Sequence, residues 1–357
     1  MITLSIGVFF RGFNASRFVL YACILLFTIL LALRLDNEIS ISYFLVFAPL
    51  FMCNLIVFIG AVIGTISFIR RPPQSSEAIL RLEFFSMLFT TVQHAVLACF
   101  EFLAADKLQI TTTDPEYKFT PEWIVVFSPL FLQCILSLFI LIWKSYCQLR
   151  LLRTNIVFPK FELFFFCNTL QFAFVAMKLD KNVEWSWAVV FIPLWVVLSL
   201  SVVGVLYALI LALLLTRSRH LLPAHRRNHL YAAILQTLLV VPALISLVLL
   251  TGKLDDTSSV QEITFVMAVV PLIASLGCLL LMSFCTRGGN VWWFALRRPF
   301  CAFVLDACPC LKQYANVSYK VGAGRSERGE AEAPPLLEEE CRALRPVVPI
   351  TTIELPD

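Results

Sequence analysis

Long apolar segments alternate with short polar segments along most of the chain. Each apolar block reaches the roughly 17–25 residues that an α-helix needs to cross a bilayer. Charged and turn-forming residues bound eight such blocks, at about 18–34, 43–68, 82–104, 122–143, 161–178, 186–215, 229–250 and 262–285. A β-barrel would show short alternating segments instead. The pattern predicts an all-α integral membrane protein with about eight transmembrane helices.

A short phrase occurs four times and groups these spans in pairs. In its clearest copy, Met177-Lys178-Leu179-Asp180 ends one span, and a few polar residues separate it from the next. Each copy has an aromatic residue six positions before a proline: Tyr43 and Pro49, Trp123 and Pro129, Trp187 and Pro193, Phe265 and Pro271. We interpret the phrase as the turn of a helical hairpin, so the chain is expected to form four hairpins.

The basic residues are unevenly distributed between the connections. The N-terminus, the even-numbered connections and the three arginines Arg287, Arg297 and Arg298 after the last span together amount to sixteen Lys and Arg residues, whereas the four phrase loops carry six and are rich in acids. By the positive-inside rule, both termini are predicted to be cytosolic. The phrase loops would then face a lumen or the cell exterior, in the endomembrane system or at the plasma membrane.

The spacing of the prolines indicates a second level of repetition. Pro49 and Pro193 are 144 residues apart, and Pro129 and Pro271 are 142 apart. This predicts two tandem four-helix halves with the same orientation, a parallel repeat whose interface could hold a transport pathway. The expected regions are a cytosolic N-terminus (1–17), a first half (18–143), a linker (144–160), a second half (161–285), an interfacial amphipathic segment (286–319) and a disordered cytosolic tail (320–357).

Two local features of the spans predict packing geometry. Pro129 lies too close to Trp143 for the helix to begin at the proline, so the proline is expected to lie about two turns inside the membrane and to kink the helix. Gly60 and Gly64 form a GxxxG pattern, which lets helix backbones approach closely. We expect an internal contact there rather than a dimer interface.

The segment after the last span is predicted to lie at the membrane surface as a C-terminal interfacial helix. It is apolar and contains Trp and Arg, but Pro299 interrupts it, so it is too broken to span. Its cysteines are candidates for palmitoylation: Cys301, Cys308 and Cys310. Further on, an acidic dileucine pattern is a candidate sorting signal, with Glu332, Leu336 and Leu337 as its residues.

Several motifs together resemble one known family. They are the repeated phrase, Gly288-Gly289-Asn290 followed by Trp292-Trp293-Phe294, Asn316-Val317-Ser318-Tyr319 and the closing Ile353-Glu354-Leu355-Pro356-Asp357. Over nearly its whole length the chain resembles the Fragile-X-F-associated transmembrane proteins, the transmembrane protein 185 family. Gln109 departs from the pattern, because the other copies have Asp there. The resemblance implies a multi-pass membrane protein of a family with no established activity, and it transfers no site residue.

A polar group within the third span is the main candidate site. His94 and Glu101 are seven positions apart and therefore share a helix face, and Gln93 adjoins them. A carboxylate or imidazole within a bilayer is costly, which favours a functional role in transport or proton transfer. The same groups can instead hydrogen-bond between helices. Partners on other spans are Asn54, Gln133, Asn168 and Gln171.

The Lys/Arg-Leu-Asp segment of each phrase has two interpretations. It could bind a lumenal ligand or ion. We favour a structural role, in which the cation interacts with the C-terminus of one helix and the Asp caps the N-terminus of the next.

Composition and motifs narrow the class of protein. The chain is 59% hydrophobic and 15% charged. It has no HExxH, GxSxG, P-loop or GxGxxG motif, no zinc-ligand spacing and no cysteine in a phrase loop. We therefore expect no enzyme, cofactor, bound metal, disulfide or nucleic-acid partner.

The first hypothesis is a non-enzymatic structural or partner-binding component, with the bilayer and a membrane protein or second copy as partners. The alternative is a transporter, channel or lipid-moving protein that uses a cleft between the halves.

Overall fold

The computed structural model describes residues 2–5, 13–73, 77–113, 121–152, 159–217, 223–255, 263–284, 292–295 and 318–321. The chain forms two compact units. The smaller unit contains an antiparallel pair of strands, β1 (Ile2–Ser5) and β2 (Ser318–Val321), in which Ile2 faces Val321. The larger unit comprises Ser16–Met282 together with Gly289–Ala295.

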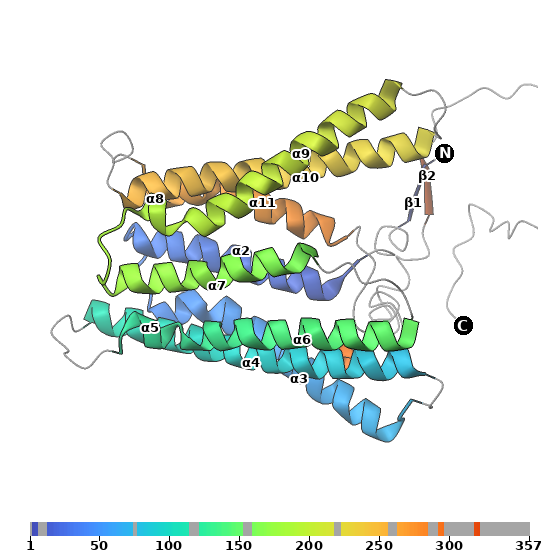
Figure 1. The fold of residues 1–357 in the computed structure, drawn as a ribbon, viewed down its shortest axis with the longest axis horizontal. Helices are drawn as coiled ribbons and strands as arrows, with labels where there is room; N and C mark the ends of the chain where they lie inside the picture. The colour runs from blue at the N-terminus through green and yellow to red at the C-terminus, as the bar shows by residue number, and fades with distance from the viewer. Residues whose placement is uncertain are drawn as a thin grey trace, which may run out of the picture. The chain divides into compact units, whose positions relative to one another are not determined.

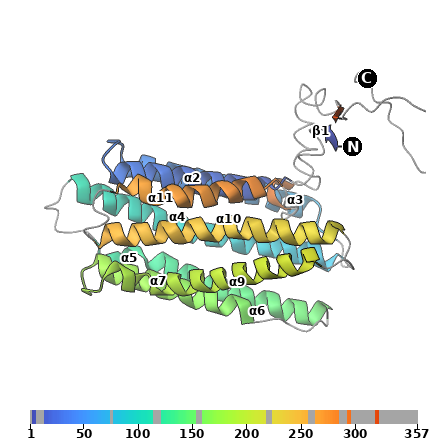
Figure 2. The ribbon, with the colours of Figure 1, turned by 90° about the horizontal axis from the view of Figure 1, so that it is seen from above.

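The larger unit is helical. Its elements are α2 (Ala15–Leu35), α3 (Tyr43–Arg70), α4 (Ala78–Thr113), α5 (Trp123–Val126), α6 (Ser128–Leu152), α7 (Pro159–Leu179), α8 (Trp187–Val190), α9 (Ile192–Arg217), α10 (Pro223–Leu254), α11 (Phe265–Met282) and the 3₁₀ turn η2 (Trp293–Ala295). The long helices run alongside one another, with α5 and α8 at one end (Figures 1 and 2).

Six of the described helices have the length and composition to cross a bilayer. They lie within α2, α3, α4, α9, α10 and α11. Large aliphatic side chains on them point outward, such as Val203 and Leu213 of α9, with 63% and 64% of their surface exposed. Outward apolar side chains suit a lipid environment, because lipid replaces water around them. The multi-pass helical class is therefore confirmed, whereas crossings by α6 and α7 stay a prediction.

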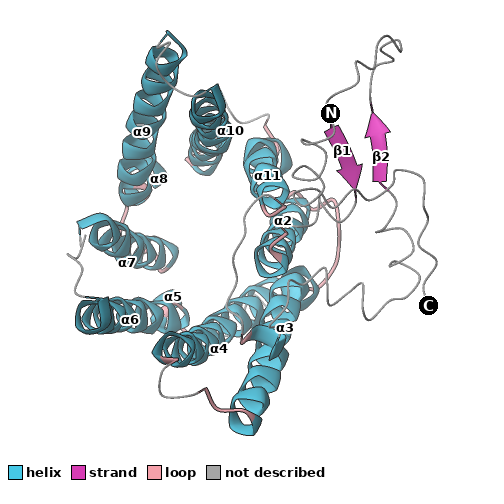
Figure 3. Ribbon diagram, turned by 90° about the vertical axis from the view of Figure 1, so that its right-hand side faces the viewer, coloured by secondary structure: helices cyan, strands magenta, loops and turns pink. Residues whose placement is uncertain are grey.

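The long helices follow one another in chain order around a ring (Figure 3). Contacts join α3 to α4, α4 to α6, α6 to α7, α7 to α9, α9 to α10 and α10 to α11. Phe27 of α2 packs on Phe47 of α3, with ring centroids 4.8 Å apart. Hydrogen bonds that the start of α11 donates to Asp36, at the end of α2, close the ring.

The repeated prolines affect the helices in two ways. A break in the helix precedes Pro129, between α5 and α6, and another precedes Pro193, between α8 and α9. Pro49 and Pro271 instead lie within the continuous helices α3 and α11. A proline removes one backbone hydrogen bond, and the neighbouring helices determine whether the helix is interrupted there.

Candidate functional site

Each phrase Asp or Gln accepts hydrogen bonds from the start of a helix in another hairpin, which is the preceding hairpin for Gln109, Asp180 and Asp255 and the last hairpin for Asp36. The second helix of each hairpin begins with backbone N–H groups that have no partner within the helix. A carboxylate can accept hydrogen bonds from these groups. We call each of these contacts a corner. The corners join Asp36 to the N–H groups of Phe265 and Val266 (2.8 and 2.8 Å), Gln109 to Tyr43 (2.8 Å), Asp180 to Trp123 and Ile124 (2.6 and 2.9 Å), and Asp255 to Trp187 and Ala188 (2.7 and 3.2 Å).

The sequence predicted the capping role of these acids but not the helix that each one caps. We expected Asp180 to cap the helix that follows it, which begins at Trp187. Asp180 caps Trp123 of the hairpin before, and Trp187 is capped by Asp255 of the hairpin after. Asp36 belongs to the first hairpin and caps the last, at Phe265. The corners therefore join neighbouring hairpins into a closed circuit.

The backbone turn that carries two of these acids explains their direction. The N–H of Glu38 donates to the carbonyl of Leu33 at 3.0 Å, and Asn37 has a φ of 60°. This is a Schellman motif, in which a left-handed residue ends the helix. The same bonding pattern occurs around Lys181, whose φ is 58°. The turn satisfies the carbonyls at the helix end and leaves the preceding Asp free to reach a neighbouring hairpin.

The cation of each phrase lies over the aromatic residue of its own hairpin. Lys107 Nζ is 4.4 Å from the centroid of the Trp123 ring, and Arg34 Cζ is 5.2 Å from that of Tyr43. Lys178 over Trp187 and Lys253 over Phe265 repeat the arrangement at 6.0 and 5.9 Å. A cation at this distance is attracted by the face of the ring. Each corner thus combines an acid or amide from one hairpin with a cation–aromatic pair from its neighbour.

The corner between Gln109 and Tyr43 differs from the other three. A carboxylate in those corners accepts two N–H groups, whereas Gln109 has one oxygen that accepts the N–H of Tyr43. The bond is also uncharged, and charge-assisted hydrogen bonds are roughly twice as strong as neutral ones. The α3–α4 interface therefore has the weakest corner.

The same α3–α4 interface contains the buried polar group that the sequence singled out. Asn54 Nδ2 of α3 donates to Glu101 Oε2 of α4 at 2.7 Å, and Nδ1 of His94 lies 2.8 Å from Asn54 Oδ1. Since an amide oxygen only accepts, the His94 ring donates from Nδ1. Glu101 and Asn54 expose 4% and 3% of their surfaces. Glu101 is thus enclosed by protein.

The other predicted polar residues do not join this group. Gln93 Nε2 donates to Ser137 Oγ of α6 at 2.8 Å, and Gln171 Nε2 donates to the carbonyl of Val190 in α8 at 3.2 Å. Asn168 is exposed on α7. The side-chain oxygen of Gln133 is buried and has no partner among the described residues. The structure therefore brings together His94 and Glu101 through Asn54 and separates the rest.

Three interhelical donors reach carbonyls that lie three residues before a proline. Gln171 donates to Val190, before Pro193. Ser246 of α10 and Ser275 of α11 donate across their shared interface to Ala268 and Leu239, three residues before Pro271 and Pro242, at 2.7 and 2.9 Å. A proline frees the carbonyl four residues before it and disturbs the rest of that turn, where side chains of neighbouring helices can bond the carbonyls. Sequence analysis missed both serines because a serine within a span bonds its own helix just as readily.

Two further predictions can be compared with the structure only in part. Trp292 is 2% exposed and packs among α3 and α4, and its depth relative to a membrane surface stays a prediction. The remainder of the predicted interfacial helix, the candidate acylation residues Cys301, Cys308 and Cys310, and the sorting residues Glu332, Leu336 and Leu337 lie outside the described residues. Those assignments stay predictions.

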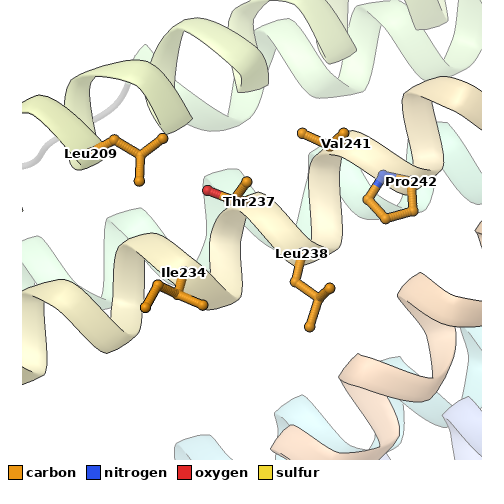
Figure 4. A pocket seen from close by; sticks show the side chains of 6 residues that line it. All are labelled: Leu209, Ile234, Thr237, Leu238, Val241 and Pro242. Carbon is orange, nitrogen blue, oxygen red and sulfur yellow. The ribbon is translucent and has the colours of Figure 1, made fainter.

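A shallow apolar groove of about 350 Å³ lies on α9 and α10 (Figure 4). Leu209, Ile234, Thr237, Leu238, Val241 and Pro242 line it. The hydroxyl of Thr237 donates to the carbonyl of Ala233 in its own helix, so the groove presents hydrocarbon only. It is remote in sequence from the polar group on α3 and α4 and does not include those residues.

Comparison with known protein families agrees with the geometry of the phrase. The family model described as Transmembrane Fragile-X-F protein matches residues 33–275, which extend from the first phrase to the helix of the last. The chain belongs to this family. The resemblance noted from the sequence is thereby confirmed, and the family description supports a transmembrane protein. No solved structure matches the chain.

Proposed function

We propose that this member of the Fragile-X-F transmembrane family is a non-enzymatic multi-pass membrane protein that acts as a structural or partner-binding component. The observation that carries the proposal is the bonding of Glu101 and His94 to Asn54 on the neighbouring helix. A transport site needs polar groups that can exchange bonds with a solute, whereas these groups are already bonded to protein. These groups lie in the α3–α4 interface, whose Gln109–Tyr43 corner is uncharged. Their position there favours a role in holding α3 against α4.

The expected arrangement in the membrane is eight crossings in two tandem four-helix halves, with both termini in the cytosol. At 1.5 Å per residue, α6 and α7 measure about 37 and 31 Å, and the hydrocarbon core is about 30 Å thick. The excess of Lys and Arg outside the phrase loops supports the orientation. Accessibility tags placed beside Asp36 and Asp180 should report the same side of the membrane. Tags on opposite sides would contradict the proposed crossings.

A transport or lipid-moving role is the second candidate function. The observation that favours it is the presence of a carboxylate and an imidazole on one face of α4, both within a candidate span. Ionisable side chains at membrane depth are costly and often mark ion or proton pathways. In this case Asn54 would orient Glu101 and His94, the two groups that can carry a proton, and not only pack α3 against α4.

Two measurements on the purified protein distinguish the two functions: the proton or ion flux in liposomes and the thermal midpoint in detergent. Glu101→Gln keeps the shape of the side chain and its bond to Asn54, while Asn54→Leu removes both bonds. We expect Asn54→Leu to lower the thermal midpoint and Glu101→Gln to lower it less, with neither change altering a proton or ion flux. Gln93→Leu, which removes a bond to α6 instead, is the matched control. A flux that is present in the natural chain and lost in Glu101→Gln would overturn the structural role.

A further inference from the structure

The glycine face of α3 is covered by a segment from the C-terminal side of the last helix. A Cβ atom placed on Gly60 would come within 2.9 Å of the Phe294 ring, and one placed on Gly64 would overlap the carbonyl oxygen of Trp292. GxxxG faces usually receive another helix. Here the close approach is made by the backbone and rings of Trp292–Ala295, which we call the clamp segment.

Trp292 contacts both helices of the α3–α4 interface. Its indole Nε1 donates to the carbonyl of Leu80 in α4 at 2.8 Å. Its ring makes edge contacts with Phe68 of α3 and Phe84 of α4, at centroid distances of 5.3 and 5.6 Å. Phe68 and Phe84 stack on one another at 3.8 Å. A single side chain therefore ties the end of α3 to the beginning of α4.

The docked clamp segment holds a strained backbone. Phe294 has φ 55° and ψ 16°, in the left-handed region that disfavours residues with a Cβ. Its ring is 37% exposed and lies against Gly60, and Trp293 packs beside Trp292 against the same cluster. The strain of one left-handed residue, about 1–2 kcal/mol, opposes docking without outweighing the burial of Trp292.

The other contacts of the α3–α4 interface show what the clamp segment adds to it. At its far end it has the one neutral corner, between Gln109 and Tyr43. The polar group of Asn54 and Glu101 lies further along the same two helices. At the end near Gly64, the clamp segment adds the bond to Leu80 and the packing on Phe68 and Phe84. Without the segment, that end of the interface loses the bond to Leu80 and the packing on Phe68 and Phe84.

We propose that the face formed by Gly60 and Gly64 is a docking surface for the chain's own Trp292–Ala295 segment, and that docking of this segment holds the α3–α4 interface closed. Docking closes the ends of α3 and α4 against one another, and release loosens them while the remaining helices stay packed. The inference concerns a conformational control within the bundle, and it holds whether the protein is structural or transports a solute.

Hydrogen–deuterium exchange of the full chain in lipid nanodiscs tests this proposal. Gly64→Ala introduces a Cβ that displaces the carbonyl of Trp292, while Gly277→Ala in α11 adds the same methyl group where nothing lies within 4 Å. We expect Gly64→Ala to raise amide exchange about tenfold near Phe68 and Phe84, as for a local opening. Gly277→Ala should leave those amides unchanged.

Variants of the clamp itself provide the second arm. Trp292→Ala should reproduce the effect of Gly64→Ala, and Trp292→Phe, which keeps a ring but loses the N–H to Leu80, should have an intermediate effect. Gly60→Ala is a milder substitution, because the Phe294 ring can turn away. Unchanged exchange near Phe68 and Phe84 in all these variants would overturn the proposal. Faster exchange throughout α10 and α11 as well would also overturn it, since the segment would then be a general requirement for folding.

Discussion

The carboxylate of Asp36 accepts hydrogen bonds from the backbone N–H groups of Phe265 and Val266, 229 and 230 residues further along the chain. This contact joins the first hairpin to the last. The other three corners join hairpins that are consecutive in sequence, so Asp36 alone closes the circuit. This contact closes a loop that contains most of the bundle, and the entropic cost of such closure grows only slowly with loop length.

Asp36→Ala should destabilise the assembled bundle. It leaves the N–H groups of Phe265 and Val266 uncapped, which costs about 1–2 kcal/mol in soluble helices. Asp36→Asn retains one acceptor and should cost less. The measurement is the free energy of unfolding in detergent, with the exposed Glu38→Gln as a matched loss of charge in the same loop. Equal stability of Asp36→Ala and Glu38→Gln would contradict the capping role.

Gln109→Glu should stabilise the α3–α4 corner. The substitution keeps the length of the side chain and supplies a charged acceptor to the N-terminus of α3 near Arg34. We expect a gain of about 0.5–1 kcal/mol, the usual effect of an acid at a helix N-terminus. Asp180→Glu is the control, because the added methylene misplaces a carboxylate that already bonds Trp123 and Ile124. Denaturant titration should show opposite signs for the two changes.

Lys181→Asn should also be stabilising. Lys181 has a φ of 58° at the same place in a Schellman motif where Asn37 has a φ of 60°. Asn tolerates the left-handed region better than Lys, and the expected gain is about 0.5–1 kcal/mol. The reciprocal change Asn37→Lys should destabilise by a similar amount. If thermal melting shows no difference for either change, the left-handed turn does not limit stability.

Ser246→Ala and Ser275→Ala should loosen the α10–α11 hairpin. Each removes an interhelical bond to a carbonyl that precedes a proline, at Ala268 and Leu239. Bonds of this type average about 0.6 kcal/mol, so the double variant should lose roughly 1–2 kcal/mol. Ser199→Ala is the matched control, because that hydroxyl bonds Val196 in its own helix. Steric-trap or denaturant unfolding measures the difference, and an equal effect of all three serines would refute the role of the interface.

The candidate polar site was only partly predictable. The spacing of His94 and Glu101 placed them on one face of a helix, which follows from helical periodicity. Which of the polar residues elsewhere would meet them depends on how the helices rotate against each other. Asn54 meets both, while Gln93 bonds Ser137 and Gln171 bonds Val190. A rotation of α4 by a single residue would change the pairs of His94, Glu101 and Gln93, and a rotation of α7 would change the pair of Gln171.

The sequence by itself determined the class of protein, the hairpin phrase and the family, because the bilayer excludes charge and unbonded backbone and so imposes a local pattern. Only the tertiary structure decided which helix Asp36 caps, which amide bridges Glu101 to His94, and that Trp292 packs on Gly64 between α3 and α4. These contacts join residues that are distant along the chain. Their distances depend on the packing of all the helices, and no local pattern of side chains encodes them.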